Sequence, residues 1–233
     1  MKNETLLTRR GLLKSGGALI VGFTLSAALP SRAPGQQAAA PGGPGGAAGG
    51  PDVDSFIAIQ ADGTVTLLTS RVDIGTGLRM AYRQIAAEEL GIPVERFGIT
   101  EGDTAFTPDH GGTGGSTGIP RGGSDIRLAA ATARQALLEM GAKQLNRPAS
   151  ELTIVSGEVQ PIAGGPGVRV GALIGGKRFS LKVNPKAPLK DPSTYSVVGK
   201  PLLRADVPGK CTGRHVYLQD FTVPGMLDRK SVV

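Results

Sequence analysis

Two short apolar runs open the body of the chain. Residues 55–60 (SFIAIQ) and 65–70 (VTLLTS) have the length and the residue types of strands. Asp62-Gly63 lies between them, and this dipeptide is a strong signal for the tight turn of a hairpin. The pattern therefore predicts two adjacent antiparallel strands.

Two longer segments have the apolar spacing of helices. Residues 78–90 place Leu78, Ala81 and Ile85 on one face, and a glycine and a proline follow closely. Residues 124–145 form a second expected helix, with a serine as its candidate N-cap. The expected buried face of this second helix consists of Ile126, Ala129, Ala133, Leu137 and Met140.

Further strands are predicted around these helices. Residues 96–101 and 152–156 have strand patterns, and shorter strands are expected at 179–183 and 216–221. Strands lead into helices through glycine turns. We therefore predict an α+β fold in which a mixed sheet carries two packed helices.

The first 33 residues are typical of an export signal. Four basic residues outnumber one acid in residues 1–14, and an apolar stretch follows at 15–29. This stretch is too short and too glycine-rich for a comfortable transmembrane helix. Arg9-Arg10, followed by Leu12-Leu13 and Lys14, resembles a twin-arginine signal. We therefore expect a periplasmic protein, with membrane association left open.

Two alternatives to a twin-arginine signal remain, an ordinary secretory signal and an uncleaved anchor. The twin-arginine route carries proteins that are already folded, often around a cofactor that is loaded in the cytoplasm. Small residues predict cleavage of the signal after Ala28 or after Ala33. Pro34 would directly follow the second cut, which is unfavourable.

A linker and the charge distribution complete this picture. Residues 34–51 contain only Gly, Pro, Ala and Gln, which is the composition of a flexible linker. The net charge of +7 invites a nucleic-acid interpretation, but residues 1–33 hold five basic residues and one acid. No Lys/Arg cluster or aromatic platform occurs in the remainder, so nucleic-acid binding is not expected.

Few residues indicate chemistry by themselves. The single cysteine, Cys211, excludes a disulfide framework and lacks a partner motif for thiolate chemistry. His110 and His215 are too few and too far apart to predict a metal site, and hydrogen-bonded or solvent-facing roles are expected instead. Glu88-Glu89 is expected to be a solvated helix end. No catalytic triad or carboxylate pair can be argued.

The first candidate site is Gly75-Thr76-Gly77, which follows a strand and opens a helix. The free N–H groups and the dipole of a helix N-terminus suit a phosphate. The dinucleotide fingerprint is incomplete, because Met80 occupies the third glycine position and no acid follows at the expected spacing. Phosphate binding and a purely structural turn both remain open, whereas a nicotinamide dehydrogenase is disfavoured.

The second candidate site is the glycine-rich loop at 111–118 (GGTGGSTG). It lacks the Gly-Lys-Ser/Thr of a P-loop. Its backbone N–H groups, including those of Gly114 and Gly115, suit an anion, as do the hydroxyls of Thr113, Ser116 and Thr117. A disordered loop is the alternative. Two such turns, each ahead of a helix, favour an anion site more than either turn alone.

Four segments resemble one enzyme family and occur in the family's order. Together they cover most of residues 52–227 and are similar to the start of the large molybdenum-binding subunits of the xanthine dehydrogenase/aldehyde oxidase family. The resemblance points to the exported branch of isoquinoline 1-oxidoreductase beta and nicotinate dehydrogenase large subunits. The segments are DSFIAIQADGTVTLLTSRVDIGTG, YRQIAAEELGIPVERF, EGDTAFTPDHGGTGGSTGI and VGKPLLRADVPGKCTGRHVYLQDFTVPGML.

This resemblance implies a ligand and a domain order. The ligand would be molybdopterin cytosine dinucleotide, whose pyrophosphate accounts for the fingerprint-like turns. Residues 52–195 would be a partial molybdopterin-binding domain, and residues 196–227 the start of a hammerhead domain. Residues 228–233 depart from the family pattern and match the translation of a common sequencing adapter, so we expect a non-native tail.

The resemblance also assigns site residues. Gly75-Thr76-Gly77 would match the family's contact to the pterin, with threonine in place of the commoner glutamine. Thr113 and Ser116 would match hydroxyls near the dinucleotide phosphates. A further family serine falls at Gly118, where Thr117 is the replacement hydroxyl.

In this family the reaction is hydroxylation of an aldehyde or N-heterocycle with oxygen derived from water. A glutamate acts as base, and electrons leave through iron–sulfur clusters on a separate small subunit, with a cytochrome as a candidate acceptor. That glutamate lies near the family's C-terminus, and no position here matches it. We therefore expect a fragment with no catalytic residue or metal ligand, inactive alone. The alternative is a secreted binding or scaffold protein that uses the same fold without a cofactor.

Overall fold

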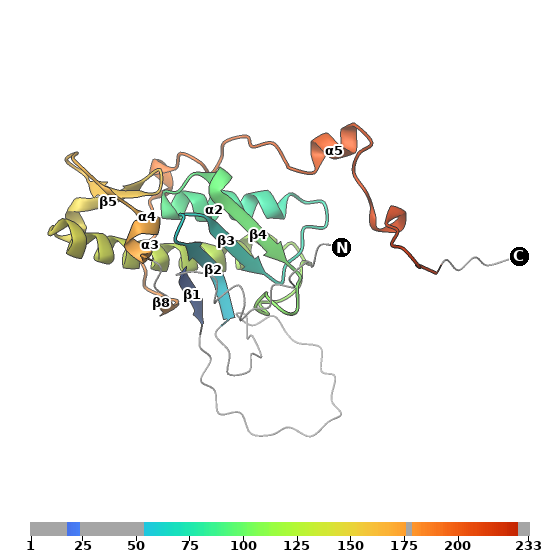
Figure 1. Cartoon of the computed structure of the whole chain (residues 1–233), viewed down its shortest axis with the longest axis horizontal. Helices are drawn as coiled ribbons and strands as arrows, with labels where there is room; N and C mark the ends of the chain where they lie inside the picture. Colours follow the sequence, from blue (N-terminus) through green and yellow to red (C-terminus); the bar gives the residue numbers. More distant parts are fainter. Residues whose placement is uncertain (1–17, 24–53, 176–178, 228–233) are drawn as a thin grey trace, which may run out of the picture. The chain divides into compact units, whose positions relative to one another are not determined.

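The computed structural model describes residues 18–23, 54–175 and 179–227 (Figure 1). Its contacts divide the chain into a first unit that ends at Lys200 and a second that begins at Pro201. The strands are β1 (Ala18–Phe23), β2 (Asp54–Gln60), β3 (Val65–Thr69), β4 (Phe97–Glu101), β5 (Leu152–Val155), β6 (Glu158–Pro161), β7 (Val168–Arg169) and β8 (Phe179–Lys182). The helices are α2 (Leu78–Leu90), α3 (Ser124–Leu145), α4 (Val170–Ile174) and α5 (Val207–Cys211), with shorter turns η1 (Val94–Arg96), η2 (Gly118–Gly123), η3 (Ala149–Glu151), η4 (Pro192–Thr194) and η5 (Leu218–Asp220).

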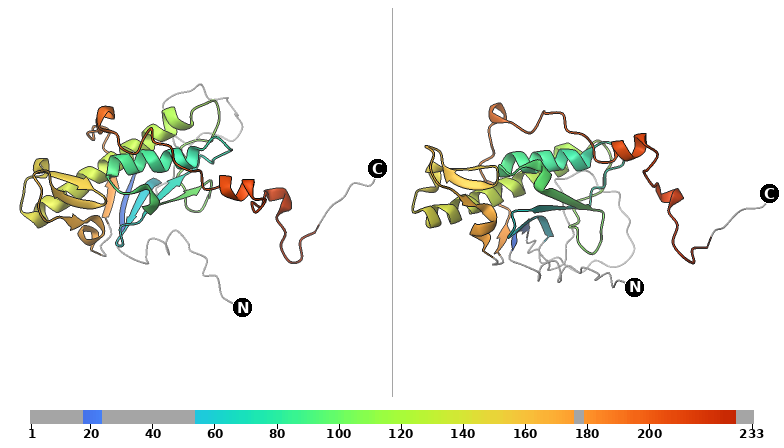
Figure 2. Two further views of the ribbon diagram at one scale, coloured as in Figure 1. Left: turned by 90° about the horizontal axis from the view of Figure 1, so that it is seen from above. Right: turned by 45° about the horizontal axis from the view of Figure 1, so that its top comes forward.

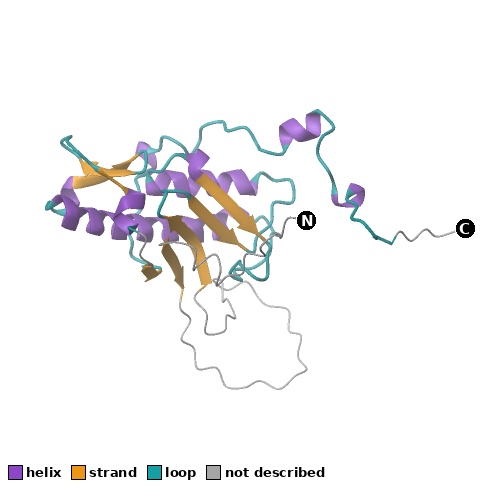
Figure 3. Cartoon of the chain, in the orientation of Figure 1, coloured by secondary structure: helices purple, strands orange, loops and turns teal. Residues whose placement is uncertain are grey.

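The first unit is built on a five-stranded sheet with the order β4-β3-β2-β1-β8 (Figure 3). Strands β2 and β3 are antiparallel, as are β1 and β2, whereas β3 pairs with β4 and β1 pairs with β8 in parallel. The sheet is therefore mixed, which confirms the predicted α+β class.

The predicted hairpin joins β2 to β3. Gly63 adopts a φ of 82°, a conformation that glycine reaches without the steric penalty of a Cβ. The Asp62 carboxylate accepts hydrogen bonds from the backbone N–H and the hydroxyl of Thr64, both through Oδ1. These local bonds explain why the Asp-Gly signal is sufficient to predict this turn.

Helices α2 and α3 lie side by side over one face of the sheet (Figure 2). The buried stripe of α2 repeats every four residues through Leu78, Tyr82, Ala86 and Leu90. Of the three residues predicted to share one face, Leu78 is buried, whereas Ala81 and Ile85 are half-buried. Tyr82, which the predicted face did not include, is 0% exposed and belongs to the core.

Helix α3 uses small side chains to approach its neighbours closely. Four of its five predicted core residues are buried, and the fifth, Met140, is half-buried. Gly141 lies against Val159 so tightly that a Cβ at Gly141 would come within 2.5 Å of that side chain. Helix α3 thereby contacts both the main sheet and the second, three-stranded sheet, whose order is β5-β6-β7.

The expectation that Glu88-Glu89 is a solvated helix end was wrong. Both side chains are buried, at 2% and 1% exposure. Glu89 forms ion pairs of 2.8 Å with both Arg127 and Arg134 of α3. Burial of a carboxylate is tolerated here because its charge is paired and its oxygens accept hydrogen bonds.

The segment after β8 returns across these helices. We call residues 184–200 the strap. The N–H of Asn184 donates to Thr132 Oγ1 at 3.0 Å, and the N–H of Lys190 donates to Glu89. Arg127 and Arg134 in turn donate to strap carbonyls. The two helices and the strap therefore share one buried polar network.

The second unit contains α5 and η5. Asp206 forms ion pairs with Arg204 and Lys210, at 2.8 and 2.7 Å. The predicted strand at 216–221 is not formed, because residues 218–220 turn as η5. Its expected identity as the start of a hammerhead domain stays a prediction.

The expected export signal is described only in part. Residues 18–23 of its apolar stretch form β1. The rest of residues 1–33, the expected linker at 34–51 and the expected tail at 228–233 lie outside the described residues. Within the described ranges, no helix is long and apolar enough to cross a membrane.

Replacement of Gly91 by alanine should test the junction between α2 and the second sheet. Gly91 ends α2 with a φ of 65°, and a Cβ there would lie 2.2 Å from the carbonyl oxygen of Ile154. We expect Gly91→Ala to cost at least about 2 kcal/mol of unfolding free energy.

Gly175→Ala is the matched control, because Gly175 ends α4 with a φ of 55° and its Cβ would meet nothing closer than 3.4 Å. It should cost about 1 kcal/mol, the conformational penalty alone. Thermal or denaturant unfolding of both variants measures the difference. Equal losses of unfolding free energy in the two variants would show that the backbone at Ile154 can move away from the added Cβ.

Candidate functional site

The two glycine-rich turns line one cavity of about 410 Å³ at the N-terminal ends of α2 and η2. Thr76 contributes from the first turn, and Thr113, Gly114, Gly115, Ser116 and Thr117 contribute from the second. Gly75 and Gly77 of the first turn do not line the cavity. Its remaining walls are Ile74, Leu78, Ala81, Gly118, Ile119 and Pro120.

The side chain of Asp73 binds the backbone N–H groups of the first turn. Its Oδ1 accepts hydrogen bonds from the N–H groups of Gly75 at 2.9 Å and Gly77 at 3.1 Å, and its Oδ2 accepts one from the N–H of Arg79 at 3.2 Å. The N–H groups of Gly75 and Gly77 are therefore not free for a phosphate, which favours the structural alternative for these two glycines. A carboxylate of the chain already occupies this end of α2, where an anion is favoured.

Glu101 holds Asp73 and the start of α2 in place from β4. The N–H of Asp73 donates to Glu101 Oε2 at 2.6 Å. Glu101 also forms an ion pair with Arg79, in the first turn of α2. The first glycine turn is thus a charged network that is complete without a ligand.

The second turn is different, because most of its backbone donors have no acceptor among the described residues. Among the described residues, the N–H groups from Gly112 to Ser116 donate to no protein acceptor. Gly115 and Ser116 both have a φ of 56°. A Cβ at Gly112 or Gly114 would meet nothing within 4 Å. This loop therefore offers exposed backbone dipoles and open space on its cavity side.

The threonine hydroxyls of this loop mainly support it. Thr113 Oγ1 donates to the carbonyl of Val72 at 2.6 Å, and Thr117 Oγ1 donates to the carbonyl of Gly114 at 2.7 Å. Their protons are committed to the protein, so neither hydroxyl is positioned to donate to an anion. The unused backbone N–H groups, with Ser116 and Thr76, carry the polar recognition that this cavity can provide.

Arg71 is the buried cation behind the second turn. It is 5% exposed and directly follows Ser70 at the end of β3. Its Nη1 donates to the carbonyl of Gly112 at 2.7 Å and to Thr117 Oγ1 at 3.0 Å, and its Nη2 donates to the carbonyl of His110 at 3.0 Å. No ion pair in the described part of the chain includes Arg71. Its charge therefore remains available to attract an anion at the loop.

Tyr82 supports the same wall from α2. Its hydroxyl donates to the carbonyl of Gly118 at 3.0 Å. Burial raises the pKa of Tyr82 to about 12, and Asp125 adds to this while Arg71 opposes it. Tyr82 is therefore a neutral hydrogen-bond donor at physiological pH.

His110 has a supporting role, as expected from the sequence. Its Nε2 lies 2.7 Å from Thr69 Oγ1, and its ring packs edge-on against Phe56 with centroids 4.9 Å apart. Its Nδ1 lies 3.6 Å from the carboxylate of Asp125. In the ranges that the structure describes, no group of three His, Cys, Asp or Glu side chains is placed to hold a metal.

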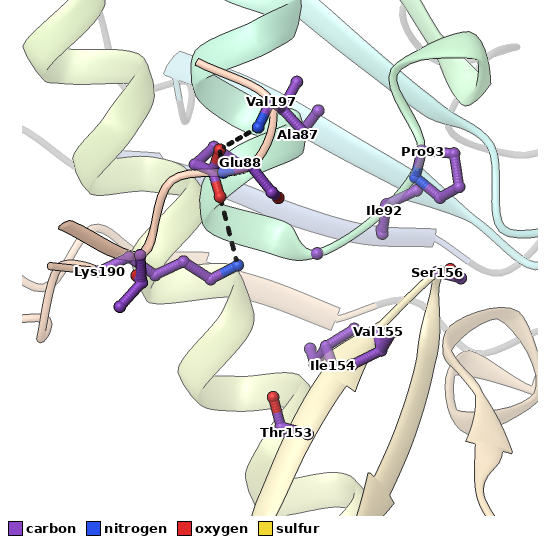
Figure 4. A pocket seen from close by; sticks show the side chains of 13 residues that line it. Ala87, Glu88, Ile92, Pro93, Thr153, Ile154, Val155, Ser156, Lys190 and Val197 are labelled. Atoms are coloured by element: carbon purple, nitrogen blue, oxygen red, sulfur yellow. Dashed lines mark hydrogen bonds and ion pairs between the residues drawn. The ribbon is translucent and has the colours of Figure 1, made fainter. Parts of the chain in front are cut away.

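A second cavity, of about 450 Å³, lies between the end of α2, β5 and the strap (Figure 4). Glu88 Oε2 accepts hydrogen bonds from the N–H groups of Ser196, Val197 and Val198, at 2.9, 2.6 and 3.0 Å. The Lys190 ammonium lies 4.0 Å from Oε1 of the same carboxylate. The Glu88 carboxylate of this cavity is therefore already paired within the protein.

Comparison with known proteins identifies the family. Residues 31–187 match the model of the molybdopterin cofactor-binding domain. The chain belongs to this family. The match contains both glycine-rich turns and the strands and helices that position them, which confirms the resemblance recognised in the sequence.

Two sequence relatives agree with this assignment, and one solved structure matches in part. One of the nicotinate dehydrogenase subunits, from Pseudomonas putida, is 38% identical over 172 residues, which are 74% of this chain and 14% of that protein. The beta subunit of isoquinoline 1-oxidoreductase from Brevundimonas diminuta is 26% identical over 95% of this chain and 32% of its own length. The crystal structure of quinoline 2-oxidoreductase from Pseudomonas putida 86 matches with a TM-score of 0.46 and 30% identity, covering 51% of this chain and 15% of that one. The chain thus spans less than a third of each of these proteins.

Replacing Arg71 by lysine should loosen the second turn. A single ammonium cannot span the three acceptors that the planar guanidinium reaches, and each hydrogen bond to a charged group contributes about 2 kcal/mol. We expect Arg71→Lys to lower stability by about 2 kcal/mol and to speed amide exchange across residues 110–117.

Arg121→Lys is the control, because Arg121 lies nearby in η2 with an exposed side chain. It should leave both stability and exchange unchanged. Loop exchange that is equal in the two variants would contradict the role assigned to Arg71.

Acidification should release the strap from Glu88. Burial opposes ionisation, but the N–H groups of Val197, Val198 and Ser196 outweigh it and hold the pKa of Glu88 below its ordinary 4.5. The stabilisation is therefore fully present above the unfolded-state pKa and is lost as pH falls through the lower folded-state pKa.

Thermal unfolding between about pH 7 and pH 3 measures this effect, since that range brackets a carboxyl titration. We expect Glu88→Gln to be less stable than the parent at neutral pH and to lose less stability on acidification. Glu95→Gln, which alters an exposed carboxylate in η1, should follow the parent. If the parent, Glu88→Gln and Glu95→Gln all lost the same amount of thermal stability on acidification, the role assigned to Glu88 would be contradicted.

Proposed function

We propose that the cavity between the two glycine turns binds the phosphate-bearing part of a molybdopterin dinucleotide. The single observation that carries this proposal is the convergence of Thr76 with the loop 113–117 on one cavity in a chain of the molybdopterin cofactor-binding family. The cytosine dinucleotide form of the cofactor belongs to the proposal, as implied by the resemblance to exported molybdenum hydroxylases.

The residues present fit such a group. The N–H groups of Gly112–Ser116 have no acceptor among the described residues, so they are available to an acceptor on a ligand. The glycines leave the backbone open to close approach, with nothing within 4 Å of the Cβ positions of Gly112 and Gly114. Arg71, which forms no ion pair within the described ranges, places a positive charge behind the loop. Backbone dipoles backed by a buried cation are the chemistry that phosphate oxygens require.

Each turn then has its own role. The second turn would donate hydrogen bonds to phosphate oxygens through its backbone and Ser116. The first turn would present Thr76 to the cofactor while Asp73 and Glu101 keep its backbone fixed. Asp73 adds negative charge near the site, so the phosphates are expected on the side of the second turn.

The native protein that contains this chain is proposed to be the large subunit of a molybdenum hydroxylase. The bound cofactor would supply two-electron oxidation chemistry that hydroxylates an aldehyde or N-heterocycle with oxygen from water. A small iron–sulfur subunit would accept the electrons, and a cytochrome is the candidate next acceptor. The chain itself would bind and orient the cofactor, and a base from outside residues 1–233 would move the substrate proton.

Export to the periplasm is part of the same proposal. It is supported by Arg9-Arg10 and the apolar stretch that follows. The twin-arginine route carries folded proteins, which suits a cofactor that is inserted during folding. Association with the membrane remains compatible with this location.

A charge reversal at Ser116 tests the cofactor site. Ser116 is exposed at a φ of 56°, a conformation that Asp and Asn tolerate better than other side chains. We expect Ser116→Asp to weaken cofactor retention about five-fold or more, since two like charges at contact distance repel by about 1 kcal/mol even in water. Ser116→Asn keeps the shape without the charge and should retain the cofactor.

The measurement is the molybdenum and cytosine nucleotide content of the purified native protein and of both variants. Equal molybdenum and nucleotide contents in Ser116→Asp and Ser116→Asn would show that no phosphate binds at this loop. A native protein free of molybdenum and nucleotide would instead favour the alternative, a scaffold protein that uses the fold without a cofactor.

A further inference from the structure

Strand β1 occupies an interior position of the main sheet. It pairs antiparallel with β2 over six residues, from Ala18 opposite Gln60 to Phe23 opposite Asp54. Its other edge pairs in parallel with β8, from Leu19 opposite Phe179 to Gly22 opposite Lys182. Among the described strands, β1 is the only one that joins β8 to the sheet.

Removal of β1 would leave a slot between β2 and β8. Two strand spacings amount to about 10 Å, too far for direct pairing. The slot would not close easily, because the residues after β8 are fixed to α3. The N–H of Asn184 donates to Thr132 Oγ1 at 3.0 Å, and its side-chain amide donates to Gln135 at 3.2 Å.

The exposed edge would belong to the core of the domain. Phe56, Ile57 and Ile59 of β2 are 0–3% exposed. The backbone N–H and C=O groups that β2 directs towards β1 would lose their partners, which is costly beside a buried core. Among the described strands, β1 is the one that pairs with this edge of β2.

The occupant of the slot is the centre of the expected export signal. A cut after Ala28 or Ala33 would fall between β1 and β2 and would detach the strand from the body. The sequence suits a strand at this place, since Ile20 and Val21 are β-branched and the apolar stretch is short for a membrane helix. Pro34 also disfavours the cut after Ala33.

We propose that residues 18–23 remain in the exported protein as β1 and that no cleavage occurs between Phe23 and Asp54. This inference rests on the proposed export. A leader held in the sheet is compatible with the twin-arginine route, because that route carries folded proteins. The paired arginines precede Ala18 and are not part of the strand.

The first test is the mass of the exported protein. The native protein that contains this chain is recovered from the periplasmic fraction, denatured, and analysed by intact mass and N-terminal peptide mapping. We expect every periplasmic chain to contain residues 18–23. An N-terminus at Leu29 or Pro34 would overturn the proposal.

A second test does not depend on export. In the unaltered folded protein, the amides of residues 19–22 should exchange at least about ten-fold more slowly than those of the linker at 34–51, because they lie in a paired strand. Equal exchange rates would overturn the proposal. A protein that stays in the cytoplasm but shows this protection would contradict only the proposed location.

A proline pair adds a matched comparison. Ile20 lies opposite Ala58 and Ser180, so Ile20→Pro removes a donor from an interior strand. We expect at least about ten-fold faster exchange in β2 and β8 of this variant, and no change in Gln37→Pro, which alters the linker. Unchanged exchange in Ile20→Pro would show that the slot does not depend on β1.

Discussion

The buried carboxylate of Glu89 fixes the arrangement on which the rest of the structure depends. It comes from α2, and its two partners, Arg127 and Arg134, come from α3. At 1% exposure, an unpaired charge here would be strongly destabilising, so α2 and α3 can adopt few relative positions. Each helix follows one glycine-rich turn. The ion pairs join the C-terminal end of α2 to the first half of α3 and thereby restrict how the two turns that precede these helices are placed.

Arg71 adds a second constraint closer to the cavity. It reaches from the end of β3 to the loop that precedes η2, and Thr113 makes the reciprocal bond to the carbonyl of Val72. These contacts fix the base of the loop to the protein, although Arg71 Nε and His110 Nδ1 are buried without a hydrogen-bond partner among the described residues. On its cavity side, the N–H groups of Gly112–Ser116 have no acceptor among the described residues. Contacts with the protein thus hold the loop on one side, and the exposed backbone N–H groups on the other side remain available to bind a ligand.

The sequence predicts the elements whose signals are local. The Asp62-Gly63 hairpin, the helix at 78–90 and the strand at 179–182 are predictable because their turns, caps and apolar spacing lie within a few residues. The resemblance to a family brings Thr76 and the loop 113–117 into one site, which spacing alone leaves open. Asp73 carries a usable signal, since an aspartate two residues before a glycine often accepts its N–H.

The misses arise from partners that are distant in sequence. Nothing near Glu89 reveals that arginines 38 and 45 residues later will bury it. Arg71 likewise contacts residues 39 to 46 positions away. The apolar run at 18–23 fits a signal and a strand equally well, because six apolar residues satisfy either pattern. In each case tertiary contacts, which have no local pattern, decide the structure.

The place of β1 in the sheet also has a consequence for the order of folding. Leu19 and Phe179 are opposite each other, although 160 residues separate them in sequence. Pairing with β8 cannot begin until the ribosome has delivered that strand, whereas β2 is available to β1 much earlier in synthesis. The parallel edge of β1 is therefore the part of this sheet that must form late.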